Sequence, residues 1–72
     1  MSRLFHITTL LNQIIKQNYK FKNIKYCKLS NETIELKITE VDPLIIKLTQ
    51  LDLEEELEKH LGNIENIPIK FS

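Results

Sequence analysis

The chain of 72 residues contains one cysteine, one glycine, two prolines and no tryptophan. A single cysteine excludes an internal disulfide, and with two histidines it gives no zinc-ligand spacing, so we expect neither a metal nor a cofactor. The scarcity of glycine and proline, with 42% hydrophobic residues, excludes a disordered chain. We expect one domain, residues 1–72, whose core supplies only about 3–5 kcal/mol, so that very good packing or a partner subunit must help.

Long hydrophobic runs and an export signal are also missing from the sequence. The longest apolar runs, such as Leu44–Ile46, are far too short to span a bilayer, and the N-terminus has no apolar stretch followed by a small-residue cleavage site. We therefore expect no contact with a membrane and a cytoplasmic location.

Acidic residues are absent from the first 31 positions, which carry six Lys or Arg residues, whereas residues 32–72 carry ten acids and four lysines. Two oppositely charged halves in one small domain suggest surfaces that meet across an oligomer, or two separate binding faces. Chance segregation of so few charges is the alternative.

Residues 33–39 alternate between apolar and polar without a break, which predicts a half-buried strand with Ile34, Leu36 and Ile38 facing a core. The preceding residues 19–29 also favour a strand, and a turn at residues 30–32, where Asn31 suits a positive φ, makes the two a hairpin.

The side on which the first strand of the hairpin buries its residues is ambiguous. Ile24 and Tyr26 point one way, while Cys27 and Leu29 point the other. Either a β-bulge resets the register or both faces of the strand are partly covered.

The N-terminal segment has the pattern of an amphipathic helix. Leu4, Ile7, Leu11 and Ile14 recur at spacings of three and four residues, which predicts a helix that begins at the N-cap Ser2 and extends to about residue 18.

Residues 44–61 allow two interpretations. Asp42 as N-cap and Pro43 in the first turn favour one helix over residues 43–61. The apolar periodicity favours a strand followed by a shorter helix, because a single helix would place two groups of apolar residues on nearly opposite faces. The first group is Leu44, Leu48 and Leu51, and the second is Ile46, Leu53, Leu57 and Leu61. We therefore predict a third strand over Leu44–Leu48 and a helix that begins at Asp52 and ends at Gly62, with the single helix as the alternative.

The C-terminal tail predicts a short edge strand, because Ile67, Ile69 and Phe71 alternate and Pro68 cannot donate a backbone hydrogen bond. The predicted fold is thus α+β in the order α-β-β-β-α-β, with an antiparallel meander and both helices on one face of the sheet.

The order helix, three strands, helix resembles that of double-stranded-RNA-binding domains. In that family the second helix begins with basic residues that meet phosphate, whereas Asp52, Glu54 and Glu55 stand at that place here. The resemblance therefore implies a similar order of elements and no shared ligand.

For function we expect a non-enzymatic protein-interaction domain, an adaptor, accessory subunit or small inhibitor of a larger macromolecule, that forms a homo-oligomer. The acidic helix and the last strand are the candidate partner-binding elements, because carboxylates can engage a basic partner and an edge strand can complete a neighbour's sheet. Their residues are Glu54, Glu55, Glu58, Ile67, Ile69 and Phe71.

Binding of RNA or another single-stranded nucleic acid is the alternative function. Residues 19–28 interleave aromatic rings, which stack on bases, with ammonium groups, which meet phosphates. The candidate residues are Tyr19, Lys20, Lys22, Lys25, Tyr26 and Lys28. An aromatic strand with solvated lysines explains the same pattern without a ligand.

Catalysis is not expected. A lone cysteine such as Cys27 in a strand is usually a small buried hydrophobe, and pairing of Cys27 with a histidine is the alternative. His60 is explained by the C-terminal end of its helix and by Glu56 one turn away, and His6 has no evident partner in the sequence.

Overall fold

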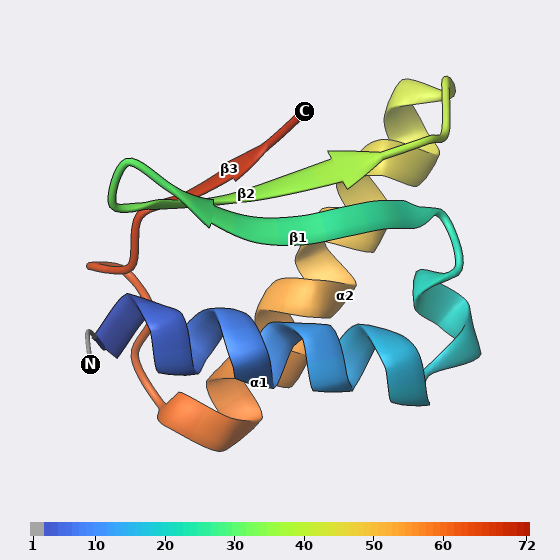
Figure 1. Cartoon of the computed structure of the whole chain (residues 1–72). Coiled ribbons are helices and arrows are strands. Elements are labelled where there is room, and N and C mark those ends of the chain that lie inside the picture. Colours follow the sequence, from blue (N-terminus) through green and yellow to red (C-terminus); the bar gives the residue numbers. More distant parts are fainter. Residues whose placement is uncertain (1–2) are drawn as a thin grey trace.

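The computed structural model describes residues 3–72 and confirms the α+β class (Figure 1). Ser2, the predicted N-cap, lies outside the described residues. Over the described range the elements are, in order, α1 (Arg3–Gln17), a short 3-10 helix η1 (Tyr19–Phe21), β1 (Ile24–Ser30), β2 (Thr33–Ile38), α2 (Pro43–Leu61) and β3 (Ile69–Phe71).

The predicted hairpin is confirmed, because β1 and β2 pair antiparallel from Ile24 opposite Ile38 to Ser30 opposite Thr33. The prediction that its first strand includes residues 19–21 is wrong, since these residues form η1 and bury Phe21. The two loop residues Asn31 and Glu32 have φ values of 49° and 64°. Positive φ at both central residues is the geometry of a type I′ turn, whose twist matches that of the flanking strands.

A β-bulge at Lys25 determines which residues of β1 face the core. Ile24 lies opposite Ile38 and Tyr26 lies opposite Lys37, so Lys25 is the extra residue of the ladder. As a result Ile24 and Cys27 are both buried, and Tyr26 turns to the outer face of the sheet.

The prediction of a third strand over Leu44–Leu48 and of a helix start at Asp52 is wrong, because residues 43–61 form the single helix α2. The Asp42 side chain accepts a hydrogen bond from the Leu44 amide at 3.0 Å, and Pro43 occupies the first turn. The periodicity argument failed because it required every apolar residue to be buried. Thr49, Leu53 and Leu57 form the buried stripe of α2, and the second apolar set remains exposed.

The sheet is not the predicted antiparallel meander, because β3 pairs parallel with β2 and gives the strand order β1-β2-β3. The helix α2 provides the crossover that a parallel pair needs. The predicted edge position of the last strand is confirmed, and its flanking Pro68 contributes a carbonyl that accepts from the Ile34 amide at 2.9 Å.

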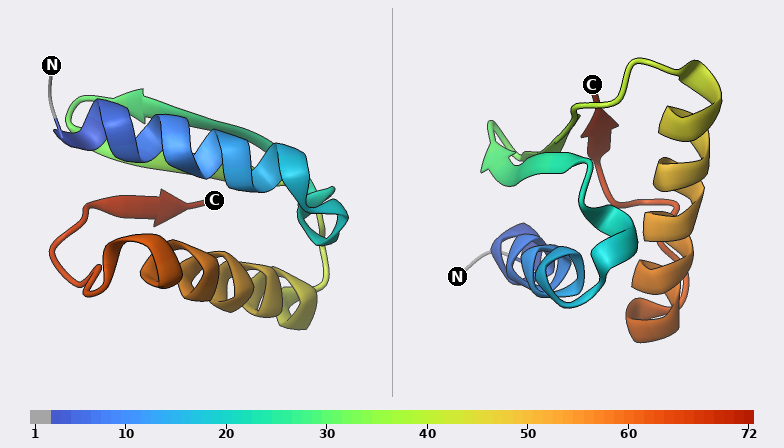
Figure 2. Two further views of the ribbon diagram at one scale, coloured as in Figure 1. Left: turned by 90° about the horizontal axis from the view of Figure 1, so that it is seen from below. Right: turned by 90° about the vertical axis from the view of Figure 1, so that its right-hand side faces the viewer.

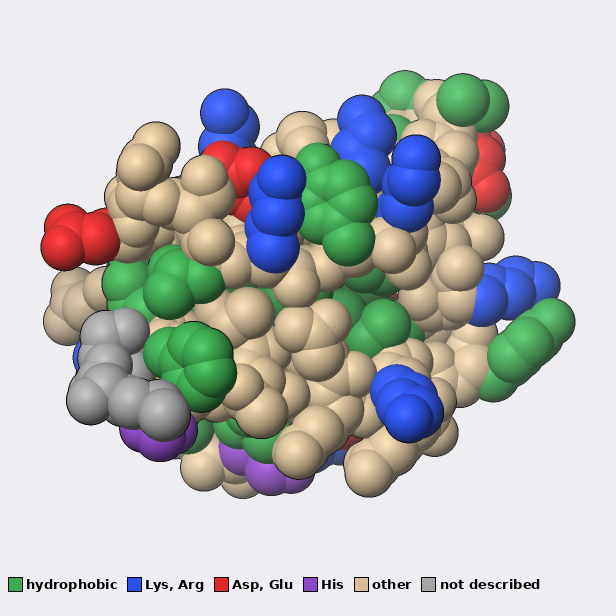
Figure 3. All heavy atoms as spheres, in the orientation of Figure 1, with side chains coloured by type: hydrophobic (Ala, Val, Ile, Leu, Met, Phe, Trp, Pro, Cys, Tyr) green, Lys and Arg blue, Asp and Glu red, His purple; other side chains and the backbone are tan. Residues whose placement is uncertain are grey.

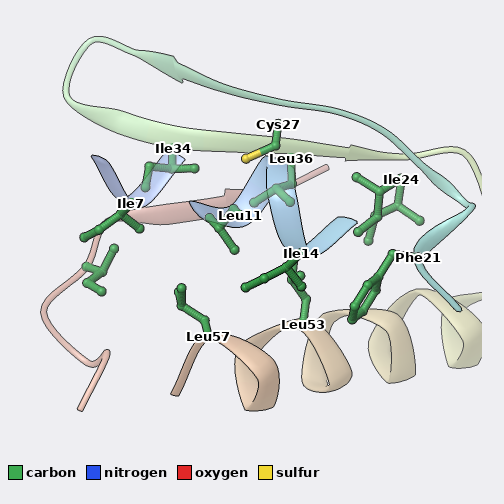
Figure 4. Close-up of a cluster of buried hydrophobic side chains, with 12 residues drawn as sticks. Ile7, Leu11, Ile14, Phe21, Ile24, Cys27, Ile34, Leu36, Leu53 and Leu57 are labelled. Carbon is green, nitrogen blue, oxygen red and sulfur yellow. The ribbon is translucent and has the colours of Figure 1, made fainter. Parts of the chain in front are cut away.

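Both helices pack on the inner face of the sheet, as predicted (Figures 2 and 4). Leu11 from α1 and Leu53 and Leu57 from α2 gather around Leu36 of β2, and each of the four is at most 1% exposed. Phe21, held by η1, fills the core beyond the C-terminal end of α1.

The side chain of Asn12 joins α1 to the free edge of the sheet. Its amide nitrogen donates to the Thr8 carbonyl and to the Cys27 carbonyl, both at 3.0 Å. The pair Ser30–Thr33 closes the two-residue hairpin, so the carbonyl of Cys27, three positions earlier, points away from β2.

We expect Asp42→Ala to lower the free energy of unfolding by about 1 kcal/mol, because it removes the N-cap of α2, and Asp42→Asn to lower it less. Asp52→Ala is the matched control, since it removes the same charge from the exposed middle of the helix. Urea denaturation followed by circular dichroism measures all three variants. Equal effects of Asp42→Ala and Asp52→Ala would show that the cap is unimportant.

Candidate functional site

The first half of α2, together with Val41 just before it, carries an apolar face that is turned away from the core. We call it the outer α2 face and define it by five residues and their exposed fractions: Val41 88%, Leu44 66%, Ile45 38%, Leu48 51% and Leu51 47%. Leu44, Leu48 and Leu51 follow one another at four and three residues and therefore share one side of the helix. Figure 2 shows α2 at the border of the domain with its outer side free of other elements, and in Figure 3 hydrophobic side chains gather where α2 begins.

Charged residues border the outer α2 face. Lys47 lies on one flank, and Glu55 and Glu58 continue the line of Leu48 and Leu51 toward the C-terminal end of α2. Two of the predicted partner-binding acids therefore adjoin the apolar face. The third, Glu54, is half-buried on the side of α2 that approaches β3.

The predicted partner-binding residues of the tail lie elsewhere. Ile67 is buried, and Ile69 and Phe71 pack against the core from β3. Their side chains thus belong to the domain's own interior, and β3 completes the chain's own sheet instead of a neighbour's.

The structure divides the predicted nucleic-acid-binding residues between two places. Tyr19, Lys20 and Lys22 lie on or beside η1, where Lys22 Nζ sits 4.8 Å from the centroid of the exposed Tyr19 ring. Lys20 is held by Glu56 at 3.4 Å. The remaining three residues, Lys25, Tyr26 and Lys28, are on β1.

On the sheet, Tyr26 and Lys28 belong to a larger group that we call the outer sheet face, made up of Tyr26, Lys28, Glu35, Lys37 and Lys70. The strand register places Tyr26 beside Lys37, and Lys28, Glu35 and Lys70 in one row across the strands. Figure 3 shows lysines around a hydrophobic side chain over this part of the molecule. Lys37 and Lys70 were missing from the predicted site, although strand alternation would have placed both on the polar side of their strands.

Glu56 connects η1 to α2 on the surface. Hydrogen bonds from Lys59 at 3.2 Å and from Lys20 at 3.4 Å lower the pKa of the Glu56 carboxyl. The pair with Lys20 joins residues that are far apart in sequence, so it helps to position η1 against the helix.

The residues considered for catalysis are not brought together. Cys27 is buried beside Leu36, and desolvation raises the pKa of its thiol to about 11. The His60 Nδ1 lies 3.0 Å from the Glu56 carbonyl, and the His6 ring stands edge-on to Phe5. Within residues 3–72 no group of three or more His, Cys, Asp or Glu side chains could hold a metal ion.

An open groove of about 500 Å³ lies where the start of α1 approaches the end of α2. It is lined by Arg3, His6, Ile7, Leu10 and Leu61. This lining contains basic and apolar side chains and lacks an acid or thiol to pair with His6, so it assembles no nucleophile and base. In the part of the chain that the structure describes, neither helix combines the length and the apolar character that a membrane span requires.

We expect the stability of the protein, relative to a Cys27→Ala variant, to fall as the pH rises from 9 to about 11. In this range the thiol of the unfolded chain has lost its proton while the buried thiol keeps it, so the native state binds more protons and the free energy of unfolding decreases. Contributions from all other groups are shared by the two proteins and cancel from the difference. Urea denaturation at a series of pH values measures it, and parallel curves for the two proteins would contradict the raised pKa.

We compared the chain with protein-family models, with curated proteins and with solved structures, and none of the three comparisons found a match. The function must therefore be argued from the two surfaces described above.

Proposed function

We propose that the chain is a non-enzymatic protein-interaction domain whose outer α2 face docks on the same face of a second copy. The exposure of Leu44, Leu48 and Leu51, between 47% and 66%, is the observation that supports this proposal. Single exposed leucines are common, but a contiguous apolar group on one helix face is typical of an interaction site. A domain of this size also gains stability from burying such a face.

Charge favours a second copy in the antiparallel orientation. A parallel pair of α2 helices would bring Glu55 and Glu58 against the same carboxylates of the second copy, which costs energy. An antiparallel pair centred between Gln50 and Leu51 instead places Glu58 opposite the first turn of the opposing helix, where the helix dipole is positive. The two dipoles then also oppose one another.

The flanks of the outer α2 face are complementary in the same arrangement. Lys47 and Glu54 are about two helical turns apart and lie on the same flank of α2. In an antiparallel pair equal flanks meet, so Lys47 of each copy approaches Glu54 of the second copy. The interface thus repeats the same ion pair twice about a two-fold axis, as an isologous interface requires.

We further propose that this self-associating domain serves as an adaptor, accessory subunit or small inhibitor of a larger macromolecule in the cytoplasm. A location in a reducing compartment fits a chain whose single thiol is free and buried.

Light scattering coupled to size exclusion tests the association. We expect the wild-type mass to rise with concentration from that of one chain, 8.5 kDa, to twice that value. Leu48→Glu should remain at the mass of one chain with an unchanged helical spectrum, because it places a charge at the centre of the interface. Tyr19→Glu is the matched control, since Tyr19 is 81% exposed on η1 outside the face, and it should dimerise normally.

A charge swap tests the orientation. Lys47→Glu should weaken the dimer by about 1 kcal/mol, because it replaces two symmetric attractions by repulsions. The double variant Lys47→Glu with Glu54→Lys should restore the dimer, whereas Lys47→Glu with Asp52→Lys should not. A wild-type protein that stays at the mass of one chain at all concentrations would overturn the proposal, even if another protein binds the face.

A further inference from the structure

The outer sheet face is the second large surface that the fold leaves uncovered. Both helices pack on the inner face, where the buried residues of β2 lie, and no helix of residues 3–72 covers the opposite side of the sheet (Figures 1 and 2). Lys28 and Lys37 are exposed on that side, and Glu35 is half-buried. Tyr26 is 39% exposed there.

Lysine dominates the charge of this face. Lys28, Lys37 and Lys70 surround one carboxylate, Glu35, and Lys25 adds a fourth ammonium group at the bulge. The ion pairs of residues 3–72 engage Lys20 and Lys59, so the ammonium groups of the sheet are available to a ligand. Adjacent strands are about 4.8 Å apart, so the row from Lys28 to Lys70 spans about 10 Å.

The aromatic side chain of Tyr26 lies between lysine side chains. Lys28 Nζ is 5.0 Å from the centroid of Tyr26, and Lys37 is the cross-strand neighbour of the same residue. A long lysine side chain can swing from the ring to a phosphate, which would open the tyrosine face to a planar ligand. The geometry thus offers one stacking surface with cations within reach on two sides.

We infer that the outer sheet face binds a single strand of nucleic acid, with a base stacked on Tyr26 and phosphates held by Lys28, Lys37 and Lys70. A single strand fits because its bases are free to leave their neighbours and stack on a side chain, whereas the base faces of a duplex are already stacked. Known RNA-binding sheets stack about two or three bases on their strands, and the span of this sheet is of the same order. The inference concerns a surface separate from the outer α2 face and does not depend on dimer formation.

Fluorescence anisotropy with labelled oligouridine and oligothymidine tests the site at low salt. We expect binding to at least one probe, with the logarithm of the association constant falling with the logarithm of salt at a slope of about −2, since about three phosphates are neutralised. Lys28→Gln with Lys37→Gln should weaken binding about tenfold. Lys16→Gln with Lys22→Gln removes the same charge away from the sheet and should leave the affinity within about twofold.

Substitutions of single groups separate stacking from charge. Tyr26→Ala should weaken binding about tenfold, while Tyr26→Phe should retain it, because stacking requires the ring and not the hydroxyl. Glu35→Gln should strengthen binding, since it removes the one carboxylate that repels phosphate.

The inference is overturned by no binding of either probe at low salt, by stronger binding of a duplex than of a single strand, or by equal losses for the sheet variant and its charge-matched control. A loss in the variant Lys16→Gln with Lys22→Gln that is absent from the sheet variant would place the binding surface away from the sheet and also overturn the inference. The Leu48→Glu variant should bind the probes as the wild type does, so that failure of the dimer and failure of this site are distinguishable. The basic face could instead contact the acidic half of a second copy. In that case the variant Lys28→Gln with Lys37→Gln will have a lower mass than the wild type at the same concentration, and this result would overturn the assignment to nucleic acid.

Discussion

The one-sided burial of β2 is the constraint on which the rest of the structure depends. Ile34, Leu36 and Ile38 are at most 4% exposed, and their amides and carbonyls face β3, while the alternate residues pair with β1. Shifting this strand by one residue would turn all three side chains into solvent and carboxylate and ammonium groups into the core. The position of both helices follows, since each must cover the same inner face.

The sequence predicts those elements whose pattern has a single physical solution. The helix over α1, the hairpin and the edge strand were all predicted, because each has a strong local signal, such as the alternation through residues 33–39. Residues 44–48 have an ambiguous signal, since alternating Leu44, Ile46 and Leu48 suit a strand as well as they suit a helix. The capping by Asp42 and Pro43 decides the outcome in the structure, and the cost of leaving leucines exposed does not prevent it.

The two candidate surfaces differ in how far they could be predicted. The outer α2 face appears in the sequence as a set of leucines opposite the buried stripe, but its exposure becomes evident only once α2 is known to be one helix. The outer sheet face depends on the bulge at Lys25, which decides that Tyr26 points outward, and on the parallel pairing of β3, which brings Lys70 beside Glu35. The pattern of residues 24–29 left the bulge as one of two alternatives, and the parallel pairing of β3 has no local signature, so the predicted site combined residues of β1 with residues of η1 that lie apart.

The hydrogen bond from Asn12 to the Cys27 carbonyl has a consequence for solubility. An unpaired strand edge is a template on which foreign chains can add, and β1 is the longer of the two edges of this sheet. By occupying an acceptor in the middle of that edge, the amide of a helix interrupts the ladder that an incoming strand would need. The short β3, with Pro68 before it and Lys70 within it, is protected by chemistry of its own. A domain with leucines exposed on one helix can thus make contacts through that helix while both borders of its sheet discourage amyloid-like growth.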